Sequence, residues 1–416
     1  MKIINRSLLI SLPFALISGP ALPDIIIVLI GLIFLIQCFK KRDWSLFKKN
    51  YSIIFLIWNL YIILISLSSD NIYLSLESSL FYFRFGIFAL AVFNIIDNDE
   101  KILKYFFWSL FSALLLVSID AWLQFFNGKN LIGYTYNNQR LNGLFGEEFV
   151  LGSFLSRLFP LFFGLAIHMY YRSKIVVICA LLLFLSIDCL IFVSGERSAF
   201  LYLILSTLVI LLLTRRWKII RLSTFIFSMI ILIFVSIYNP SAKKRMVDQT
   251  LNQTNILKDN IVDMKFNIFS VQHEVIYKSA SKIFLDNKFF GIGPKMFREV
   301  CQQKEYQFFV DEDRSVNGCQ LHPHNSYLQL LTETGVVGFI PVFLLLILIL
   351  KRFVNHSFFI FTKNANHLLS DYQINLYACL LITLFPFVPT GNFFSNWINV
   401  IYFLPIGFLL HTYKKN

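Results

Sequence analysis

The feature that most constrains this chain is a series of long apolar runs separated by polar turns. About twelve runs are long enough, or nearly so, to cross the roughly 30 Å hydrocarbon layer of a membrane as helices. They are 7–20, 23–38, 51–68, 76–96, 104–126, 149–170, 174–193, 198–214, 218–237, 335–350, 372–389 and 393–411. Only 15% of the residues are charged, against roughly 25% in soluble domains. The sequence therefore predicts an all-α integral membrane protein.

Basic residues mark one side of the membrane. When the twelve spans cross the membrane in alternating directions, Lys2 and Arg6 fall on the same side as a larger set of basic clusters. These clusters are 40–42, 48–49, 172–174, 215–221, 351–352 and 414–415. Because cytoplasmic loops carry an excess of Lys and Arg, this side is predicted to be the cytoplasm, with both termini there. The net charge of +13 follows from this pattern, so we do not expect nucleic acid as a partner.

Three regions follow from the threading. Residues 1–237 hold spans one to nine, 238–334 form a long polar loop on the outer side, and 335–416 hold the last three spans and a tail. The first apolar run imitates a signal peptide, but a second run follows at once, so a retained helix is expected. Cys301 and Cys319 are the two cysteines of the polar loop, which favours a disulfide if the loop faces an oxidising compartment.

Charged residues also occur inside the predicted spans. Arg84, Asp120, Arg157 and Asp188 all fall in the outer half of their spans when the chain is threaded. Such groups are costly in hydrocarbon, and they usually face a cavity or one another. We expect these four to share a polar cavity that opens outward. The alternative is that long side chains reach the nearest interface, which is the reading we prefer for Glu77.

The polar loop closes with His-Pro-His-Asn-Ser at 322–326, followed by an apolar helical pattern. Ser326 and Gln329 have the S-x-x-Q spacing of a capping box, which predicts a short helix starting at Ser326. His322 and His324 then lie beside the positive end of that helix, where a neutral imidazole is favoured and can accept a proton. Taken alone, a His-x-His pattern more often has a structural or metal-binding role.

Together with Glu333 and Gly335, which suits a helix end, this motif resembles the signature of the O-antigen ligase and O-antigen polymerase superfamily. Its members are integral-membrane glycosyltransferases that use polyprenyl-diphosphate-linked glycans. The resemblance implies a long extracytoplasmic loop before the tenth span. It also implies that His324 is the general base, supported by His322, Asn325 and Glu333.

Arginines suited to a diphosphate form a second element of the resemblance. The turn Ser194-Gly-Glu-Arg197-Ser-Ala is similar to the family turn whose arginine contacts the donor diphosphate. A guanidinium stays charged in a low dielectric and binds phosphate oxygens in a bidentate fork. The segment 140–152 resembles a Gly-Phe-Gly element of the family, in which Glu148 would orient an arginine or contact acceptor hydroxyls. A plain glycine-rich turn is the alternative for that segment.

One position departs from the family pattern. His273 stands where the resemblance places a second phosphate-contacting arginine, upstream of Gly-Ile-Gly-Pro at 291–294. Arg298, Arg140 and Arg245 are the candidates for the missing ligand. We prefer Arg298 because it follows the Gly-Pro turn.

The resemblance implies transfer of a glycan from undecaprenyl diphosphate to a sugar hydroxyl, such as that of lipid A–core, at the periplasmic face of a bacterial inner membrane. A polymerase that joins two lipid-linked repeats needs the same base and clamp, so the motif leaves that alternative open. A flippase or other transporter is a further alternative, although transporters more often show internal repeats. No cofactor or metal is expected, because arginines would hold the diphosphate.

Overall fold

The computed structural model describes residues 2–136, 140–238, 243–253, 269–309, 317–362 and 368–414. Within these ranges the chain is helical and forms no β-strand, which confirms the all-α prediction. The helices are α1 (Lys2–Ala15), α2 (Ala21–Lys41), α3 (Asn50–Leu67), α4 (Ile72–Ser79), α5 (Phe83–Asn98), α6 (Lys101–Asn127), η1 (Gly143–Phe145), α7 (Leu151–Tyr170), α8 (Lys174–Val193), α9 (Arg197–Leu213), α10 (Lys218–Tyr238), η2 (Lys244–Asp248), α12 (Gln249–Gln253), α13 (Val271–Asp286), α14 (Phe297–Val300), η4 (Lys304–Tyr306), α15 (Ser326–Phe361), α16 (Asp371–Thr383) and α17 (Asn396–Lys414).

Among the described residues, eight helical segments are long and apolar enough to cross a membrane. They are Ala21–Lys41, Asn50–Leu67, Ile72–Asn98, Lys101–Asn127, Leu151–Tyr170, Lys174–Val193, Lys218–Ile237 and Ser326–Ile360. The chain is therefore a multi-pass membrane protein. Each of the twelve predicted runs overlaps a helix, but α1, α9, α16 and α17 are too short or insufficiently apolar to join the eight. The count of twelve crossings stays a prediction.

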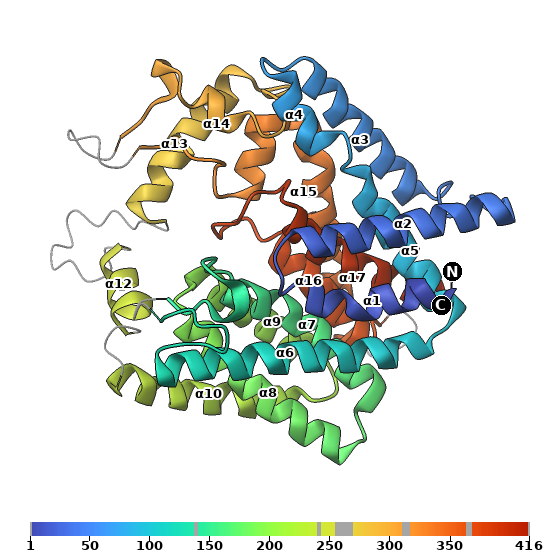
Figure 1. The fold of residues 1–416 in the computed structure, drawn as a ribbon, viewed down its shortest axis with the longest axis vertical. Helices are drawn as coiled ribbons and strands as arrows, with labels where there is room; N and C mark the ends of the chain where they lie inside the picture. The colour runs from blue at the N-terminus through green and yellow to red at the C-terminus, as the bar shows by residue number, and fades with distance from the viewer. Residues whose placement is uncertain are drawn as a thin grey trace.

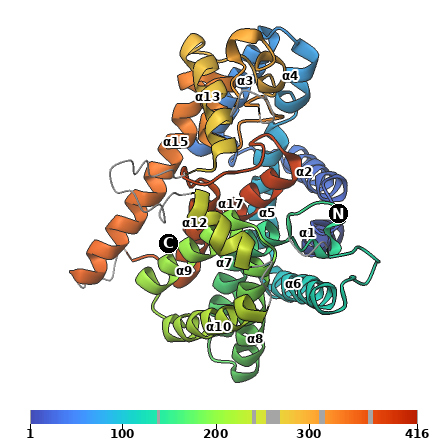
Figure 2. The same cartoon turned by 90° about the vertical axis from the view of Figure 1, so that its left-hand side faces the viewer.

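The helices divide along the longest axis of the molecule. In both views, α13 lies at one end with α3, α4 and the start of α15, whereas α8 and α10 lie at the other end (Figures 1 and 2). The centre is formed by α5 against α17 and by α7 against α16. In Figure 1 both termini lie at the right-hand edge, and α12 lies at the opposite edge.

The predicted span 76–96 is divided into two helices. α4 ends at Ser79 and α5 begins at Phe83, so the helix is interrupted at residues 80–82, in the first third of the segment. A hydroxyl cluster accounts for the position of α4: Ser66 of α3 shares hydrogen bonds of 2.7 Å with Ser79 and 2.9 Å with Ser75. Hydropathy alone does not reveal this break, because both pieces are apolar.

A buried ion pair joins α8 to α10. The guanidinium of Arg221 donates to both carboxylate oxygens of Asp188 at 2.8 and 3.1 Å, and Thr207 and Ser228 complete the network. Both charged side chains are 0% exposed. We predicted that Asp188 faces an outward cavity, and that prediction is wrong. Arg221 lies in the first turn of α10, and its position at the cytoplasmic end of the span stays a prediction. Two opposite charges in a low-dielectric interior are far less costly when they pair.

Candidate functional site

The motif at 322–326 is held by the start of α15 and by the loop between α16 and α17. Asn325 is the N-cap: its Oδ1 accepts from two amides in the first turn of α15, and its Nδ2 donates 2.8 Å to Pro386 O. The predicted capping box is therefore wrong. Ser326 instead shares a hydrogen bond of 2.9 Å with Thr390, and Gln329 binds Asn392 at 2.8 Å. Asn325 occupies the cap because its longer side chain reaches two orphan amides at once.

The backbone of His324 has a left-handed conformation, with φ at 53°. This conformation costs about 1 kcal/mol for a residue with a Cβ. Two hydrogen bonds to its carbonyl oxygen hold it there, one from Thr390 N at 2.8 Å and one from the Tyr277 hydroxyl at 3.4 Å. The backbone conformation of His324 is thus held by hydrogen bonds from distant parts of the chain.

Three imidazoles form a row, which we call the histidine row: His322, His324 and His273. The ring centroids of His322 and His324 are 4.1 Å apart, and those of His324 and His273 are 5.7 Å apart. Burial lowers the pKa of His324. Burial, with smaller effects of His324 and Arg197, lowers the pKa of His273 to about 4. Each ring is therefore uncharged near neutral pH and able to accept a proton.

A cavity of about 1020 Å³ lies on one side of the row, and His322 is on its wall. Its polar wall also carries Arg298, Lys295, Arg84 and Glu148. The remaining wall comes largely from apolar side chains of α2 and α5, so the cavity has a charged end and an apolar end. His322, rather than the predicted base His324, is the histidine that lines this cavity.

The four charges predicted to share one cavity are dispersed. Arg84 lines the cavity, where its Nε donates to Asp24 at 3.0 Å. Asp120 is buried, and its carboxylate accepts from the amide of Leu131 at 2.9 Å. Arg157 is buried against the ring of Tyr202, with 4.7 Å from guanidinium carbon to centroid. Since Asp188 is bound by Arg221, the single shared cavity is wrong.

Glu333 acts as a brace between α14 and α15. Its side chain is 0% exposed, and its Oε1 and Oε2 accept from Phe297 N at 3.3 Å and from Gln329 Nε2 at 2.9 Å. Its backbone oxygen accepts from Gly293 N at 2.8 Å, so the Gly-Ile-Gly-Pro turn is docked on the same residue. Gly335 breaks α15 two residues later, with φ at 63°, and a Cβ there would lie 2.1 Å from Phe289 O.

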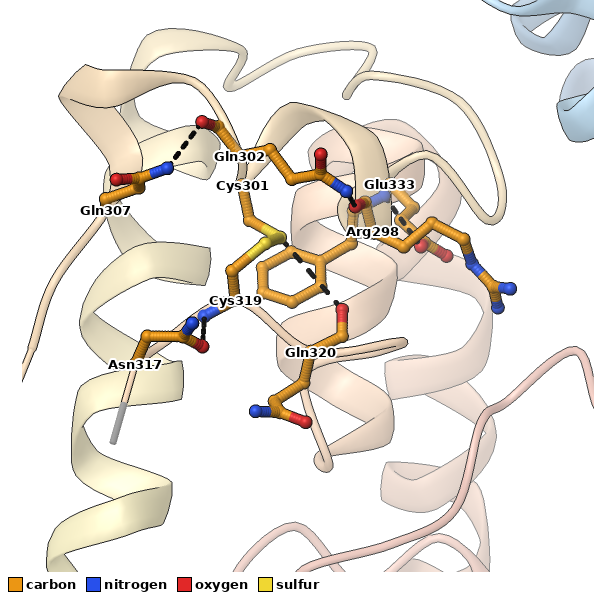
Figure 3. The surroundings of a disulfide bond; sticks show 9 residues. Arg298, Cys301, Gln302, Gln307, Asn317, Cys319, Gln320 and Glu333 are labelled. Carbon is orange, nitrogen blue, oxygen red and sulfur yellow. Dashed lines mark hydrogen bonds between the residues drawn. A yellow bond between two sulfur atoms is a disulfide. The ribbon is translucent and has the colours of Figure 1, made fainter. Parts of the chain in front are cut away.

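A disulfide joins Cys301 and Cys319, whose Cα atoms are 5.1 Å apart. The disulfide links the end of α14 to the segment that leads to His322. Figure 3 shows the side chain of Arg298 extending away from the disulfide and past Glu333. Burial of His322 lowers its pKa to about 3, and the charge of Arg298 adds to that effect. Arg298 therefore belongs to the cavity side of the histidine row.

The arginine turn at 194–197 is docked on the N-terminus of α7. Both carboxylate oxygens of Glu196 are used: Oε1 accepts from Gly152 N at 2.7 Å, and Oε2 accepts from the amide and hydroxyl of Ser153 at 3.1 and 2.8 Å. A Cβ at position 152 would lie 2.5 Å from Ser194 Oγ, so only glycine allows this approach. Sequence reasoning did not single out Glu196, although a carboxylate near a helix N-terminus is a recognisable signal.

Three arginines lie in or beside this turn: Arg197 within it, and Arg140 and Arg245 next to it. We call them the arginine cluster. Arg245 Nε donates to Gly195 O at 2.9 Å. Burial lowers the pKa of Arg140, the neighbouring charge of Arg245 lowers it further, and Glu196 opposes both effects. The charge of Arg197 acts on His273, whereas the charge of Arg298 acts on His322, at the other end of the row.

In the part of the chain that the structure describes, no group of three or more His, Cys, Asp and Glu side chains is arranged to hold a metal ion. Metal independence of the reaction itself stays a prediction.

Residues 178–343 match the family model described as O-antigen ligase. The resemblance to the O-antigen ligase superfamily is confirmed. The matched stretch contains the arginine turn, Arg245, the histidine row and Glu333. No curated protein matches the chain. The match indicates an enzyme of the O-antigen ligase and polymerase type, which acts on a lipid-linked glycan and a glycan acceptor.

Proposed function

We propose that the protein transfers a glycan from undecaprenyl diphosphate to a sugar hydroxyl, at the periplasmic face of a bacterial inner membrane. The acceptor oxygen attacks the anomeric carbon, and the new glycosidic bond forms while the bond from that carbon to the diphosphate oxygen breaks. His324 takes the proton of the acceptor hydroxyl as general base. Undecaprenyl diphosphate leaves with the bonding electron pair.

The observation that carries this proposal is the placement of the histidine row between two cationic regions. The arginine cluster lies on the side of His273, and the cavity wall with Arg298 lies on the side of His322. A donor diphosphate held by Arg197 would develop negative charge next to fixed guanidinium groups. An acceptor in the cavity would then approach the row from the opposite side, with Glu148 and Arg298 at its polar end.

The family match favours a second candidate of the same chemistry, a polymerase that joins two lipid-linked repeats. The base and the diphosphate clamp are common to both reactions, so the acceptor alone distinguishes them. We place the ligase first, with lipid A–core or a similar glycan as the acceptor.

The test is transfer by the purified chain, with undecaprenyl-diphosphate-linked glycan as donor and either lipid A–core or a second lipid-linked repeat as acceptor. His324→Ala should abolish transfer, and Arg197→Lys should fail almost as badly because lysine lacks the planar fork. His322→Ala should be milder, and EDTA should leave the rate unchanged. Transfer by His324→Ala at the rate of the unaltered protein would refute the role of His324. Failure of the unaltered protein with both acceptors would refute the function.

A further inference from the structure

We propose that Arg245 is the second guanidinium that binds the donor diphosphate, in place of the arginine that the family pattern puts at position 273. The proposal rests on the proposed function and names a residue of its binding site. Arg245 belongs to η2, far from Arg197 in sequence, yet its Nε donates 2.9 Å to Gly195 O. Its guanidinium is thereby fixed to the same turn that presents Arg197.

Reciprocal contacts hold these two arginines together. Arg197 Nη2 donates 3.3 Å to Gln249 Oε1, and Gln249 follows η2 directly at the start of α12. One arginine therefore reaches from η2 to the turn, and the other reaches from the turn to α12. Met246, the neighbour of Arg245, is buried against the helix bundle, so η2 is anchored by an apolar contact as well.

The charge of the arginine cluster favours an anion. The charges of Arg140 and Arg245 act on each other and on the carboxylate of Glu196, and the charge of Arg245 also acts on Arg197. The carboxylate oxygens already accept three hydrogen bonds from Gly152 and Ser153 of α7. Like charges repel in partly buried surroundings, and a bound diphosphate relieves that repulsion while filling the guanidinium forks.

The two other candidate positions for a second diphosphate ligand, His273 and Arg298, have different surroundings. Nδ1 of His273 lies 2.6 Å from Ser270 Oγ, and burial holds its pKa at about 4, so it is an uncharged group at neutral pH. Arg298 lies on the cavity wall with His322. Neither therefore supplies the second positive charge on the side of Arg197, whereas Arg245 does.

The experiment measures binding of undecaprenyl diphosphate and of undecaprenyl monophosphate to the purified full chain in lipid nanodiscs. The variants are Arg245→Gln, Arg245→Lys and, as matched control, Lys244→Gln. Lys244 is an exposed basic residue of the same η2 turn, so the control removes an equal charge without touching the arginine turn.

We expect the unaltered protein to prefer the diphosphate. Arg245→Gln should weaken diphosphate binding at least tenfold, which corresponds to about 1.4 kcal/mol, and should abolish the preference over the monophosphate. Arg245→Lys should lose several-fold, since it keeps the charge but not the fork, and it serves as the test if the glutamine variant does not fold. Lys244→Gln should change binding less than about twofold, because exposed charges contribute little.

The results separate the two proposals. If the unaltered protein binds undecaprenyl diphosphate but both Arg245 variants bind it equally well and keep the preference, the assignment of Arg245 is wrong. A loss in Lys244→Gln as large as that in Arg245→Gln would also overturn it, since net charge alone would then explain the effect. If the unaltered protein binds neither lipid, the proposed function itself fails.

Discussion

The imidazole rings of His322 and His324 lie with their centroids 4.1 Å apart, at the start of the helix that carries Glu333. A proton on either ring would place a charge against the other ring and in partly buried surroundings. Burial is the largest cause of the lowered pKa of both groups, and it also lowers that of His273. The three imidazoles are therefore uncharged near neutral pH before one of them takes the proton of the acceptor hydroxyl.

A pH dependence of stability follows from these shifts. The pKa values of His273 and His322, about 4 and about 3 in the folded protein, lie below the ordinary histidine value of about 6.5. Below about pH 6.5 the unfolded chain therefore binds more protons than the folded chain, and stability falls as pH drops toward 4. The slope is up to about 1.4 kcal/mol per pH unit for each histidine. Above pH 6.5 the two groups should contribute no pH dependence.

The measurement is the melting temperature of the purified protein between pH 7.5 and 4.5. A His273→Asn, His322→Asn double variant should lose less stability over this range than the unaltered protein, because neither residue then titrates. Parallel curves for the two proteins would show that the buried histidines do not control acid stability.

Removal of one partner of the buried pair should be severely destabilising. Asp188→Ala leaves the guanidinium of Arg221 buried without its carboxylate, which costs roughly 3–5 kcal/mol in unfolding experiments. The matched control is Asp286→Ala in the exposed i,i+4 pair with Lys282, where little loss of stability is expected because solvent screens the pair. Denaturant unfolding in detergent gives both values. Equal, small effects of the two substitutions would contradict the buried pair.

The disulfide should stabilise the loop that leads to His322. The bonded cysteines are 18 residues apart, and the chain-entropy model gives about 3 kcal/mol for a loop of this size. A Cys301→Ser, Cys319→Ser double variant should melt at a lower temperature and transfer glycan more slowly. A reducing agent should reproduce both effects in the unaltered protein and have no effect on the double variant. If the reducing agent slowed glycan transfer by the double variant as much as by the unaltered protein, the loss of activity would come from another thiol.

The predicted topology has its own test. With both termini in the cytoplasm and 238–334 in the periplasm, reporter fusions after Asn252 and after Lys414 should report opposite sides. The same side for both reporters would remove the basis for a periplasmic active site.

The positions of the helices were largely predictable because hydropathy is a local property of the chain. Runs such as 51–68 and 174–193 coincide closely with α3 and α8. The break between α4 and α5 was not predictable, because it depends on hydroxyl contacts between Ser66 and Ser79 rather than on a change of composition.

The candidate site was predictable to the extent that its residues form short motifs. The histidine motif and the arginine turn are contiguous in sequence, whereas their supports are distant. Asp188 and Arg221 lie 33 residues apart, and a basic residue near the end of a span looks like an interface anchor until its partner is known. The N-cap was misassigned because Asn325 and Ser326 are both good capping residues, and only the fold decides between them.

The loop between α16 and α17 binds the histidine motif through contacts such as Thr390 N to His324 O and Ser326 to Thr390. Ser326 and Thr390 are 64 residues apart, so a ribosome working at roughly 5–20 residues per second completes the second partner several seconds after the first. During that interval the growing chain carries the motif residues without the contacts that orient them. A protein stopped before this loop would contain every histidine of the row and still lack the geometry that makes one of them a base.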